Sequence, residues 1–575
     1  MNLPDTRIIH SQPIKLKMEH RRNVLRFSFV ILALLISLLI FSARLIFIQV
    51  FRSPHWTGLA AKQHNTYIEL EPVRGTIYDR NLRPMAFNVP VYSLFANPKI
   101  MTEDEKRQAV EKLSPLLGLS PEFIADRLRR DKYFIWIQRK LSLETTAQIK
   151  ELKLKGIDFQ RESERFYPNG NLAAHVIGFA DTDNKGLEGM ELYYDSILRG
   201  KAGRMQVLRD AHQTALQVEQ DFLPPQDGFD LVLTIDETIQ YITERALESA
   251  YKKHDAKAAS VIVMDVKTGE VLALANQPTY NLDEVYKSNV ENRTNRAVSY
   301  VYEPGSVFKV VTAAAALEED LFKEEDKINC ENGKYRIANH ILTDHHPYGI
   351  LSFREVIGKS SNIGVTKIAQ KIGSAIVYKY GQRFRFGMPT GIDLAGEVSG
   401  WLKDPGQWSK TTIGAIPIGY EITVTPLQLV AAITAIANEG VFMRPFVVKY
   451  IKDKNDQIIK QFEPQAVDRV ISPDTARRLT EILKGVVETG TGTRAKIEGI
   501  EVAGKTGTAR KVIDGKYVQG KYFASFIGFA PADNPRLAMV VVVDQPHPYY
   551  FGGTVAAPVF QEIMANSLKY LKISE

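Results

Sequence analysis

An apolar run near the N-terminus constrains this chain more than any other feature. Residues 27–43 contain no charged side chain, and residues 45–51 extend the run if Arg44 snorkels to the membrane interface. Six Lys and Arg residues precede it within residues 1–26, against two acidic residues. The positive-inside rule then predicts a cytoplasmic N-terminus and places everything after about residue 50 across the membrane.

A cleaved signal peptide is the alternative for the same run. The run is long for the apolar part of a signal peptide, and Phe41-Ser-Ala43 is a poor small-x-small cleavage site. We therefore expect an uncleaved, single-pass anchor over residues 27–50.

The length, net charge and cysteine content limit what kind of protein the rest of the chain can be. With 575 residues, at least two domains are expected beside the anchor. The net charge is only +7, and no Lys/Arg stripe with interleaved aromatic residues is present, which argues against nucleic-acid binding. Cys330 is the only cysteine, so an intrachain disulfide and a Cys-based metal site are both excluded.

Two prolines and a glycine within residues 223–228 indicate a domain boundary, because they break both helix and strand. We predict a cytoplasmic tail at 1–26, the anchor at 27–50, a pedestal domain at 51–225 and a second domain at 226–575. The pedestal carries three marked motifs with no catalytic logic of their own. They are Arg74-Gly-Thr-Ile-Tyr-Asp-Arg80, Arg165-Phe-Tyr-Pro-Asn-Gly170 and Gly186-Leu-Glu-Gly-Met-Glu191.

The first of these motifs carries opposite charges. Arg74, Asp79 and Arg80 are predicted to form a buried network among themselves, which makes the pedestal structural.

The sequence of the second domain predicts an α+β fold. Periodicity predicts a strand at 231–235, a helix at 237–253 and a hairpin of 261–264 with 271–274. Further strands are expected at 524–529 and 537–543, with a closing helix at 557–571. The middle, about 307–490, is helix-rich, with apolar helices at 310–317 and 427–437. This order favours helices packed on one sheet over a doubly wound fold.

The candidate nucleophile is Ser306, three residues before Lys309. That spacing is one helical turn, so both side chains share a face near the start of a helix. A lysine amine held neutral by desolvation can take the proton of a serine hydroxyl. Taken alone, a serine followed three residues later by a lysine is a weak signal.

Two later motifs strengthen it. Ser360-Ser-Asn362 and Lys505-Thr-Gly-Thr508 follow in the order that penicillin-binding proteins and serine β-lactamases share. Lys267-Thr-Gly269 has the same spelling as the last motif, but it precedes the serine and joins two apolar runs, so we predict a hairpin turn there.

Each residue of these motifs has a predicted role. Ser360 relays a proton between Lys309 and the leaving amine, and Asn362 holds the substrate amide. Lys505 supplies positive charge for the peptide carboxylate.

The rest of the third motif binds substrate. The hydroxyls of Thr506 and Thr508 bond the same carboxylate, and Gly507 leaves the strand face bare for an added peptide strand. The backbone N–H groups of Ser306 and Thr508 form the oxyanion hole.

The sequence resembles the class B penicillin-binding proteins, in particular the division-specific peptidoglycan D,D-transpeptidases. Beyond the three motifs, the resemblance rests on several segments. These are Arg74–Arg80, Tyr167-Pro-Asn-Gly170, Ala174-His-Val-Ile-Gly178, Leu233-Thr-Ile-Asp236, Asn295-Arg296, Tyr302-Glu-Pro-Gly-Ser306 and Val424-Thr-Pro-Leu-Gln428.

The resemblance implies an enzyme that cross-links peptidoglycan stem peptides of lipid II-derived glycan strands at the septum and is acylated by β-lactam antibiotics. It implies a catalytic domain of β-lactamase-like fold, in which a helix-rich middle packs on an antiparallel sheet, and no metal or organic cofactor. It also implies the bacterial inner membrane as the location, a periplasmic catalytic domain, and a glycosyltransferase partner of the FtsW type among other division proteins.

One segment departs from the family pattern. Pro417-Ile-Gly-Tyr-Glu421 stands where the family usually reads S-x-G-Y-G, so a carboxylate replaces a glycine. We expect an altered loop with catalysis retained.

Four other functions are alternatives. An elongation-specific transpeptidase has the same machinery. A class A β-lactamase needs a glutamate with asparagine four residues on, and no such pair occurs between residues 397 and 501. A β-lactam sensor would need a cytoplasmic signalling domain, which the predicted 26-residue tail does not provide. A non-catalytic division scaffold would be expected to have a broken motif set, whereas all three motifs are intact.

His340, His345 and His346 beside Asp344 suggest a metal site, but without helical i, i+4 spacing a polar loop is the better interpretation.

Overall fold

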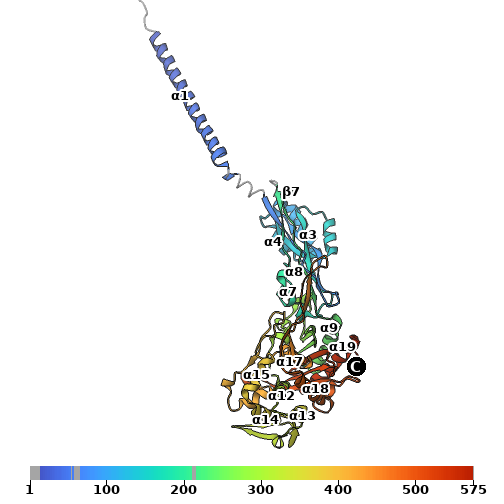
Figure 1. The fold of residues 1–575 in the computed structure, drawn as a ribbon. Coiled ribbons are helices and arrows are strands. Elements are labelled where there is room, and N and C mark those ends of the chain that lie inside the picture. The colour runs from blue at the N-terminus through green and yellow to red at the C-terminus, as the bar shows by residue number, and fades with distance from the viewer. Residues whose placement is uncertain (1–12, 54, 57–64, 210–214, 574–575) are drawn as a thin grey trace, which may run out of the picture. The chain divides into compact units, whose positions relative to one another are not determined.

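A computed structural model describes residues 13–53, 55–56, 65–209 and 215–573 (Figure 1). Internal contacts divide the chain into two units. The first contains residues up to 70 together with 202–225, and the second contains 71–201 together with 226 onward. The two units are described separately below.

The first unit contains helix α1, Pro13–Ile46, followed by a π-helical turn, Phe47–Phe51. Side chains from residue 21 to 51 are exposed, and among the described residues this is the one helix long and apolar enough to cross a membrane. The helix fits the predicted single-pass anchor and is longer than the predicted 27–50. The predicted tail, 1–26, lies partly outside the described residues.

The same unit also contains a small antiparallel sheet of strand order β1-β6-β7. Its strands are β1 (Asn65–Leu70), β6 (Gly203–Arg209) and β7 (Ala215–Leu223).

The second unit opens with a mixed α/β region that packs around its own apolar core. The core includes Leu94, Leu113 and Ile124, all without exposed surface. The elements of this region are β2 (Ile77–Tyr78), β3 (Pro84–Ala96), α3 (Glu103–Leu117), α4 (Pro121–Leu128), β4 (Ile135–Leu141), α5 (Leu143–Glu151), β5 (Ile157–Phe166), α6 (Ala174–Ile177), α7 (Gly189–Tyr193) and α8 (Asp195–Leu198).

One sheet runs from this region into the rest of the unit. Its strand order is β19-β18-β8-β2-β3-β4, with β5 paired to β3. Strand β8 (Asp230–Leu233) lies parallel to β2 and antiparallel to β18 (Val448–Lys452), which in turn pairs with β19 (Ile458–Gln461). Backbone hydrogen bonding therefore connects residues 71–201 to the segment after residue 226.

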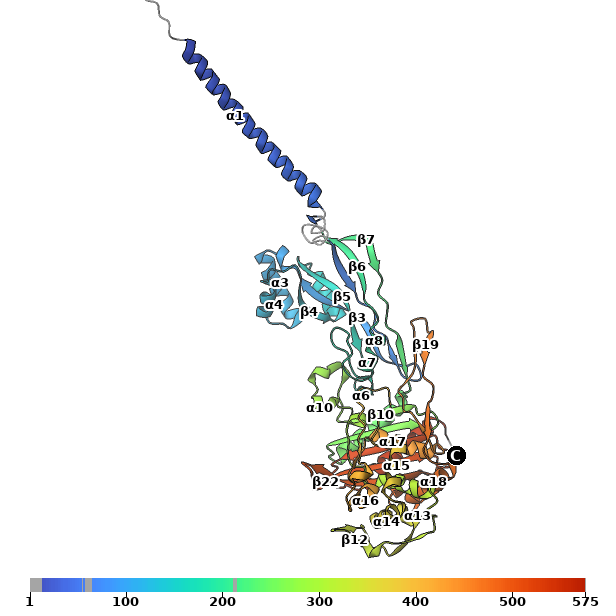
Figure 2. The ribbon, with the colours of Figure 1, turned by 60° about the vertical axis from the view of Figure 1, so that its left-hand side comes forward.

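A five-stranded antiparallel sheet forms the centre of the second unit, in the order β10-β9-β23-β22-β21 (Figure 2). The strands are β9 (Ala258–Asp265), β10 (Val271–Gln277), β21 (Ala503–Ile513), β22 (Lys516–Ala530) and β23 (Leu537–Asp544). Alternate residues of β9 enter different cores: Val261 and Val263 pack into one, whereas Ile262 and Met264 pack into the other. Both faces of the sheet are therefore buried.

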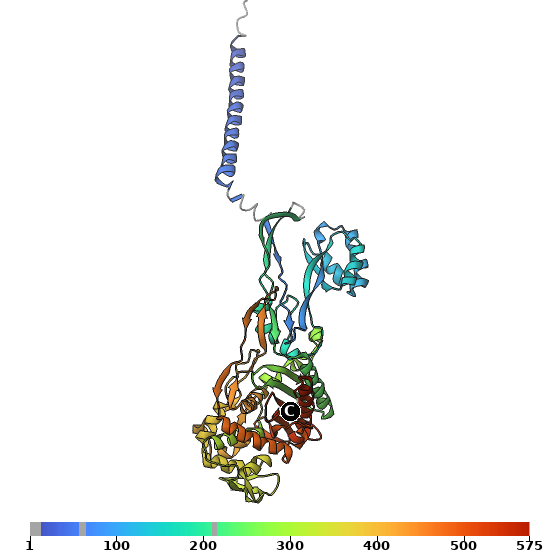
Figure 3. The same ribbon diagram turned by 45° about the vertical axis from the view of Figure 1, so that its right-hand side comes forward.

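Helices cover the two faces. Helices α9 (Glu237–Lys253) and α19 (Gly552–Tyr570) pack against each other and on one face, where Figure 3 shows the dark red C-terminal helix beside the green α9. Helix α17 (Pro426–Ala437), buried along its whole length, packs on the other face. The structure thus confirms the predicted helix-rich middle on an antiparallel sheet.

Helix α12 (Lys309–Glu318) lies inside the helix-rich region and contacts α14, α15 and α18. The other helices there are α10 (Val290–Arg293), α11 (Arg296–Ser299), α13 (Phe353–Gly358), α14 (Asn362–Ile372), α15 (Ser374–Arg383), α16 (Thr412–Ala415) and α18 (Pro473–Glu488). Short strand pairs join β11 (Lys327–Asn329) to β14 (Ile350–Ser352), β12 (Lys334–Ile337) to β13 (His340–Thr343), β15 (Trp401–Leu402) to β16 (Ile422–Thr423), and β17 (Val441–Met443) to β20 (Ala466–Arg469).

The predicted elements of this part match closely. Helix α9 has the predicted bounds, and β9 pairs with β10 as the predicted hairpin. The closing helix begins at Gly552, five residues before the predicted start, and carries Pro558 within its second turn. Pro558 lies beyond the first four helical residues, so it removes one intrahelical hydrogen bond without ending the helix.

The predicted charge network of the pedestal was wrong in its partners. Arg74 does not pair with Asp79; its guanidinium donates to Glu191 at 2.6 Å and to Asp195 at 2.7 Å. Arg165 donates to the other oxygen of Glu191 at 2.6 Å. Glu191 has no exposed surface, so one buried carboxylate holds together all three pedestal motifs.

Asp79 and Arg80 have separate partners. The Asp79 carboxylate accepts the backbone N–H groups of Asn81 and Arg83, and Arg80 pairs with Glu270 at 3.1 Å. Both side chains therefore fix the turn after β2, outside the buried network.

We predict that Glu191→Ala destabilises the chain by about 3–5 kcal/mol, because two buried guanidinium groups lose their shared counter-charge. Chemical unfolding of the detergent-solubilised chain measures the change. Glu248→Ala is the matched control, since it removes an exposed pair with Lys252 worth at most about 1 kcal/mol. Equal effects of the two substitutions contradict a structural role for the network.

Candidate active site

Ser306 lies on a 3-10 turn, Gly305–Phe308, that runs directly into α12 at Lys309. This agrees with the predicted position near a helix start. The Ser306 side chain is half-buried, and among the residues that the structure describes none hydrogen-bonds its hydroxyl. The hydroxyl is therefore free to meet a ligand.

Two glycines fix the position of this turn. The Gly305 N–H donates to the Gly419 carbonyl at 3.0 Å, and both residues have positive φ angles, +57° and +84°. A Cβ atom at Gly419 would lie 2.0 Å from the Gly305 oxygen. Only glycine permits this approach, so the segment containing Gly419 forms a wall directly behind the serine turn.

Lys309 is completely buried, and its Nζ meets the second motif. The Nζ atom lies 2.6 Å from the Ser360 carbonyl oxygen, 2.7 Å from Asn362 Oδ1 and 3.2 Å from Ser360 Oγ. Burial lowers the pKa of Lys309 well below its ordinary value, and the nearby Lys505 lowers it further. This environment disfavours the protonated amine and favours the neutral form.

The second motif is held by a residue to which the sequence analysis gave no role in the site. Asp344 accepts the backbone N–H of Asn362 at 2.5 Å and the Ser361 hydroxyl at 2.6 Å, at the N-terminus of α14. Ser360, with a φ of +58°, turns its carbonyl toward Lys309. Asp344 was noted only as part of a histidine-rich loop, because no spacing in the sequence connects it to a helix 18 residues later.

Lys505 reaches the same point from the sheet. Its Nζ donates to Ser360 Oγ at 3.0 Å and to the Thr506 carbonyl at 3.1 Å. Burial lowers the pKa of Lys505 to about 7. The Ser360 hydroxyl therefore lies between two buried amines, Lys309 and Lys505.

The neighbouring threonines are also oriented. Thr506 Oγ1 lies 2.6 Å from Thr491 Oγ1, and Thr508 Oγ1 accepts the backbone N–H of Gly552 at 3.1 Å. Strand β21 is the last strand of the sheet, so its outer edge has no strand partner among the described residues. An open edge beside the motif fits the predicted addition of an extended peptide.

The reason given for Gly507 was wrong. A Cβ atom there would lie 2.3 Å from Ser525 Oγ and 3.0 Å from the Pro304 carbonyl oxygen. The missing side chain therefore faces the interior and lets the serine turn pack on β21. The serine turn also packs tightly on β21 at Gly305, because a Cβ atom there would lie 3.1 Å from the Thr508 carbonyl oxygen.

Family comparisons agree with this geometry. A model of the penicillin binding protein transpeptidase domain matches residues 259–565, and a model of the penicillin-binding protein dimerisation domain matches residues 69–233. The chain belongs to the penicillin-binding protein transpeptidases.

Individual relatives align with nearly the whole length of this transpeptidase chain. It is 36% identical to "Probable peptidoglycan D,D-transpeptidase PenA" of Neisseria gonorrhoeae over 96% of this chain and 93% of the relative. It is 36% identical to "Stage V sporulation protein D" of Bacillus subtilis over 95% and 86%. To "Peptidoglycan D,D-transpeptidase FtsI" of Escherichia coli it is 34% identical over 97% and 94%.

Solved structures share the fold. A peptidoglycan synthetase from Bifidobacterium adolescentis superposes with a TM-score of 0.73 at 26% identity, covering 89% of this chain and 97% of that one. Penicillin binding protein 3 of Mycobacterium tuberculosis, complexed with aztreonam, gives 0.69 at 28% identity over 88% and 98%. These comparisons confirm the predicted family, the α+β fold class and an enzyme of the transpeptidase type.

The departure at Glu421 is accommodated by this transpeptidase. Glu421 has a φ of +56°, the conformation that favours the glycine usual at this position. Its carboxylate accepts the Thr412 hydroxyl at 2.9 Å and Lys403 at 3.3 Å, while its N–H donates to Glu303 at 2.9 Å. These contacts hold the glutamate in the loop at a positive φ angle.

Two features that resemble sites are structural. In Lys267-Thr-Gly269, the N–H groups of Lys267 and Thr268 donate to Asp265 and Gly269 has a φ of +80°, which confirms the predicted hairpin turn. His345 packs on Phe551 and His346 on Tyr348.

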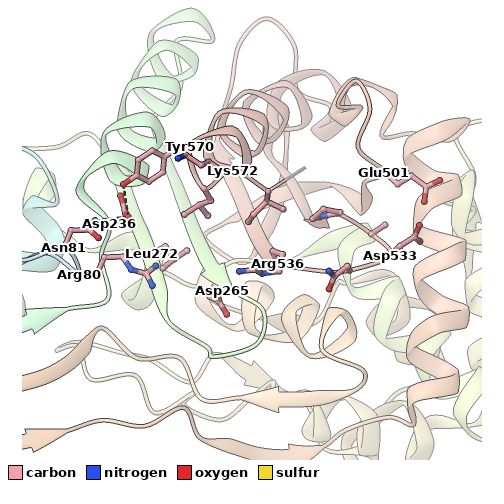
Figure 4. Close-up of a pocket in the computed structure, with 15 residues that line it drawn as sticks. Arg80, Asn81, Asp236, Asp265, Leu272, Glu501, Asp533, Arg536, Tyr570 and Lys572 are labelled. Atoms are coloured by element: carbon pink, nitrogen blue, oxygen red, sulfur yellow. Dashed lines mark hydrogen bonds between the residues drawn. The ribbon is translucent and has the colours of Figure 1, made fainter. Parts of the chain in front are cut away.

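A cavity of about 1090 Å³ lies away from the motifs, next to Arg80, Leu272 and the end of α19 (Figure 4). Its described lining includes none of the predicted site residues. The Tyr570 hydroxyl donates to Asp236 across it at 3.4 Å. Charged side chains of both signs line it without a nucleophile beside a base, so we assign the chemistry to the Ser306 site.

We predict that Gly419→Ala lowers the rate of acylation by a fluorescent penicillin at least about 100-fold, because the added Cβ displaces the serine turn and misplaced reacting groups lose rates of this order. Gly396→Ala is the matched control: Gly396 has the same φ of +84° but nothing within 4 Å of its Cβ position. Stopped-flow labelling compares the two variants. Equal losses would show that backbone strain alone, without contact to the turn, causes the effect.

Proposed function

We propose that this transpeptidase cross-links peptidoglycan stem peptides through an acyl-enzyme on Ser306. The observation that carries the proposal is the fully buried Lys309 amine, one helical turn from a free serine hydroxyl and in contact with Ser360 and Asn362. A lysine that acts as general base for serine must be neutral, and burial beside a second amine lowers the pKa of Lys309 and so favours that form.

In the first half-reaction, Ser306 Oγ attacks the carbonyl carbon of the penultimate D-Ala and its proton passes to Lys309. The two short contacts of Nζ take up the two N–H bonds of a neutral amine, which leaves its lone pair for the proton. When the C–N bond breaks, the proton passes through the Ser360 hydroxyl to the departing D-Ala amine. The second half-reaction reverses these transfers, as an acceptor amine attacks the ester and releases Ser306.

Substrate binding uses the edge of the sheet. Lys505, with the hydroxyls of Thr506 and Thr508, binds the terminal carboxylate, and the N–H groups of Ser306 and Thr508 stabilise the oxyanion. Asn362 holds the substrate amide. β-Lactams present a carboxylate and a reactive carbonyl in the same arrangement and acylate the same serine.

Family resemblance supports a proposal for the cellular setting. We place the enzyme at the division septum, in the inner membrane, with its N-terminus in the cytoplasm and its catalytic domain in the periplasm, beside an FtsW-type glycosyltransferase. The four-part division at residues 26, 50 and 225 remains a prediction. An elongation role is the alternative: depletion that produces filaments supports division, whereas round cells support elongation.

Labelling with a fluorescent penicillin tests the chemistry. We expect a long-lived adduct on the peptide containing Ser306 by mass spectrometry. The adduct is absent in Ser306→Ala and retained in Ser288→Ala, where the lost hydroxyl donates to the Val285 carbonyl. Rapid turnover of the adduct supports a β-lactamase instead. A lack of any adduct in the unaltered chain contradicts the proposal and supports a scaffold.

The pH profile of acylation gives a further prediction. The second-order rate constant reports the free enzyme. It falls with decreasing pH as Lys309 becomes protonated, and it also falls above about pH 7 as Lys505 loses its charge, because burial lowers the pKa of Lys505 to about 7. The methyl ester of benzylpenicillin has no carboxylate, so it retains the acidic limb and loses the alkaline one. If the ester shows the same alkaline limb, Lys505 does not bind the carboxylate.

A further inference from the structure

Two rings meet at the entrance of the site, from segments more than 200 residues apart in the sequence. The centroids of His345 and Phe551 are 5.9 Å apart, with ring planes at 79°. Both side chains keep exposed surface, so the contact lies at the rim of the site.

His345 is attached to the wall that carries the second motif. The residue before it, Asp344, accepts the N–H of Asn362, and the Thr343 carbonyl accepts the Asn362 side-chain amide at 3.0 Å. The two residues directly before His345 are therefore hydrogen-bonded to Asn362.

Phe551 is attached to the opposite wall. The next residue is Gly552, whose N–H holds the Thr508 hydroxyl at 3.1 Å. A Cβ atom at Gly552 would lie 2.3 Å from the Gly507 carbonyl oxygen. The backbone after Phe551 thus packs tightly on the third motif.

The charges around His345 suit a neutral ring. Burial lowers the pKa of His345 most, and Arg510 of β21 and His346 of the same loop lower it further, while Asp344 opposes them. A neutral imidazole packs on an apolar ring without the cost of desolvating a charge, which fits the contact with Phe551.

We propose that His345 is a positioning residue for acylation: through its ring contact with Phe551 it holds Gly552 against Thr508 and fixes the third motif opposite Ser306. The inference rests on the proposed function, because it assumes that Thr508 binds the carboxylate and the oxyanion. His346 provides an internal contrast, because its ring contacts Tyr348 of its own loop, 5.8 Å away.

The test uses the full chain in detergent and the second-order rate constant of acylation by benzylpenicillin. Loss of an aromatic pair of up to about 1.5 kcal/mol corresponds to about a tenfold decrease, which we expect for His345→Ala and for Phe551→Ala. The double variant loses no more than either single variant, because both remove one contact. His345→Phe restores the rate to within about twofold by keeping a ring there, and His346→Ala changes nothing.

A second substrate separates positioning from direct contact with the ligand. 6-Aminopenicillanic acid has no aryl side chain, and a positioning role predicts the same loss for both compounds in His345→Ala. A loss with benzylpenicillin alone shows that His345 contacts the ligand, which overturns the inference, as do additive losses in the double variant.

Thermal unfolding identifies any variant that fails to fold, and His345→Phe then decides the outcome. If the unaltered chain forms no adduct, the proposed function fails. If it forms the adduct and His345→Ala acylates normally, only this inference fails.

Discussion

The site depends on the burial of two lysine amines around one serine hydroxyl. Lys309 and Lys505 have no exposed surface, and both reach Ser360 Oγ, at 3.2 and 3.0 Å. Water would keep both amines protonated, and a protonated lysine cannot accept the proton of Ser306. The helices and the sheet exclude water here, and mutual repulsion of the two amines adds to the desolvation that lowers the pKa of Lys309.

Most of the surrounding fold acts on the positions of these groups. The apolar helix α12 buries Lys309, Asp344 fixes the start of α14, and the close approach of Gly419 to Gly305 sets the serine turn. Further away, the buried Glu191 joins three pedestal motifs whose sheet continues into the catalytic part through β8. Residues 71–201 of the pedestal are therefore hydrogen-bonded to the catalytic part through their backbone.

The sequence predicted the parts that have a local or ordered signal. Helix α9, the hairpin at Gly269 and the three motifs in their order follow from periodicity, turn chemistry and spacing. The partners of Arg74 and the role of Asp344 did not, because both depend on contacts between segments distant in the chain. For Gly507 the residue was identified with the wrong reason: the sequence does not show which face of a strand another segment packs against.

The central claim is that Lys309 is neutral in the resting enzyme at neutral pH. A neutron crystal structure near pH 7 measures this directly by counting deuterons on Lys309 Nζ. We predict two deuterons, directed at the Ser360 carbonyl and Asn362 Oδ1, which leave the Nζ lone pair for the Ser306 proton. Three deuterons on Lys309 Nζ would contradict this claim, because a protonated amine cannot activate Ser306.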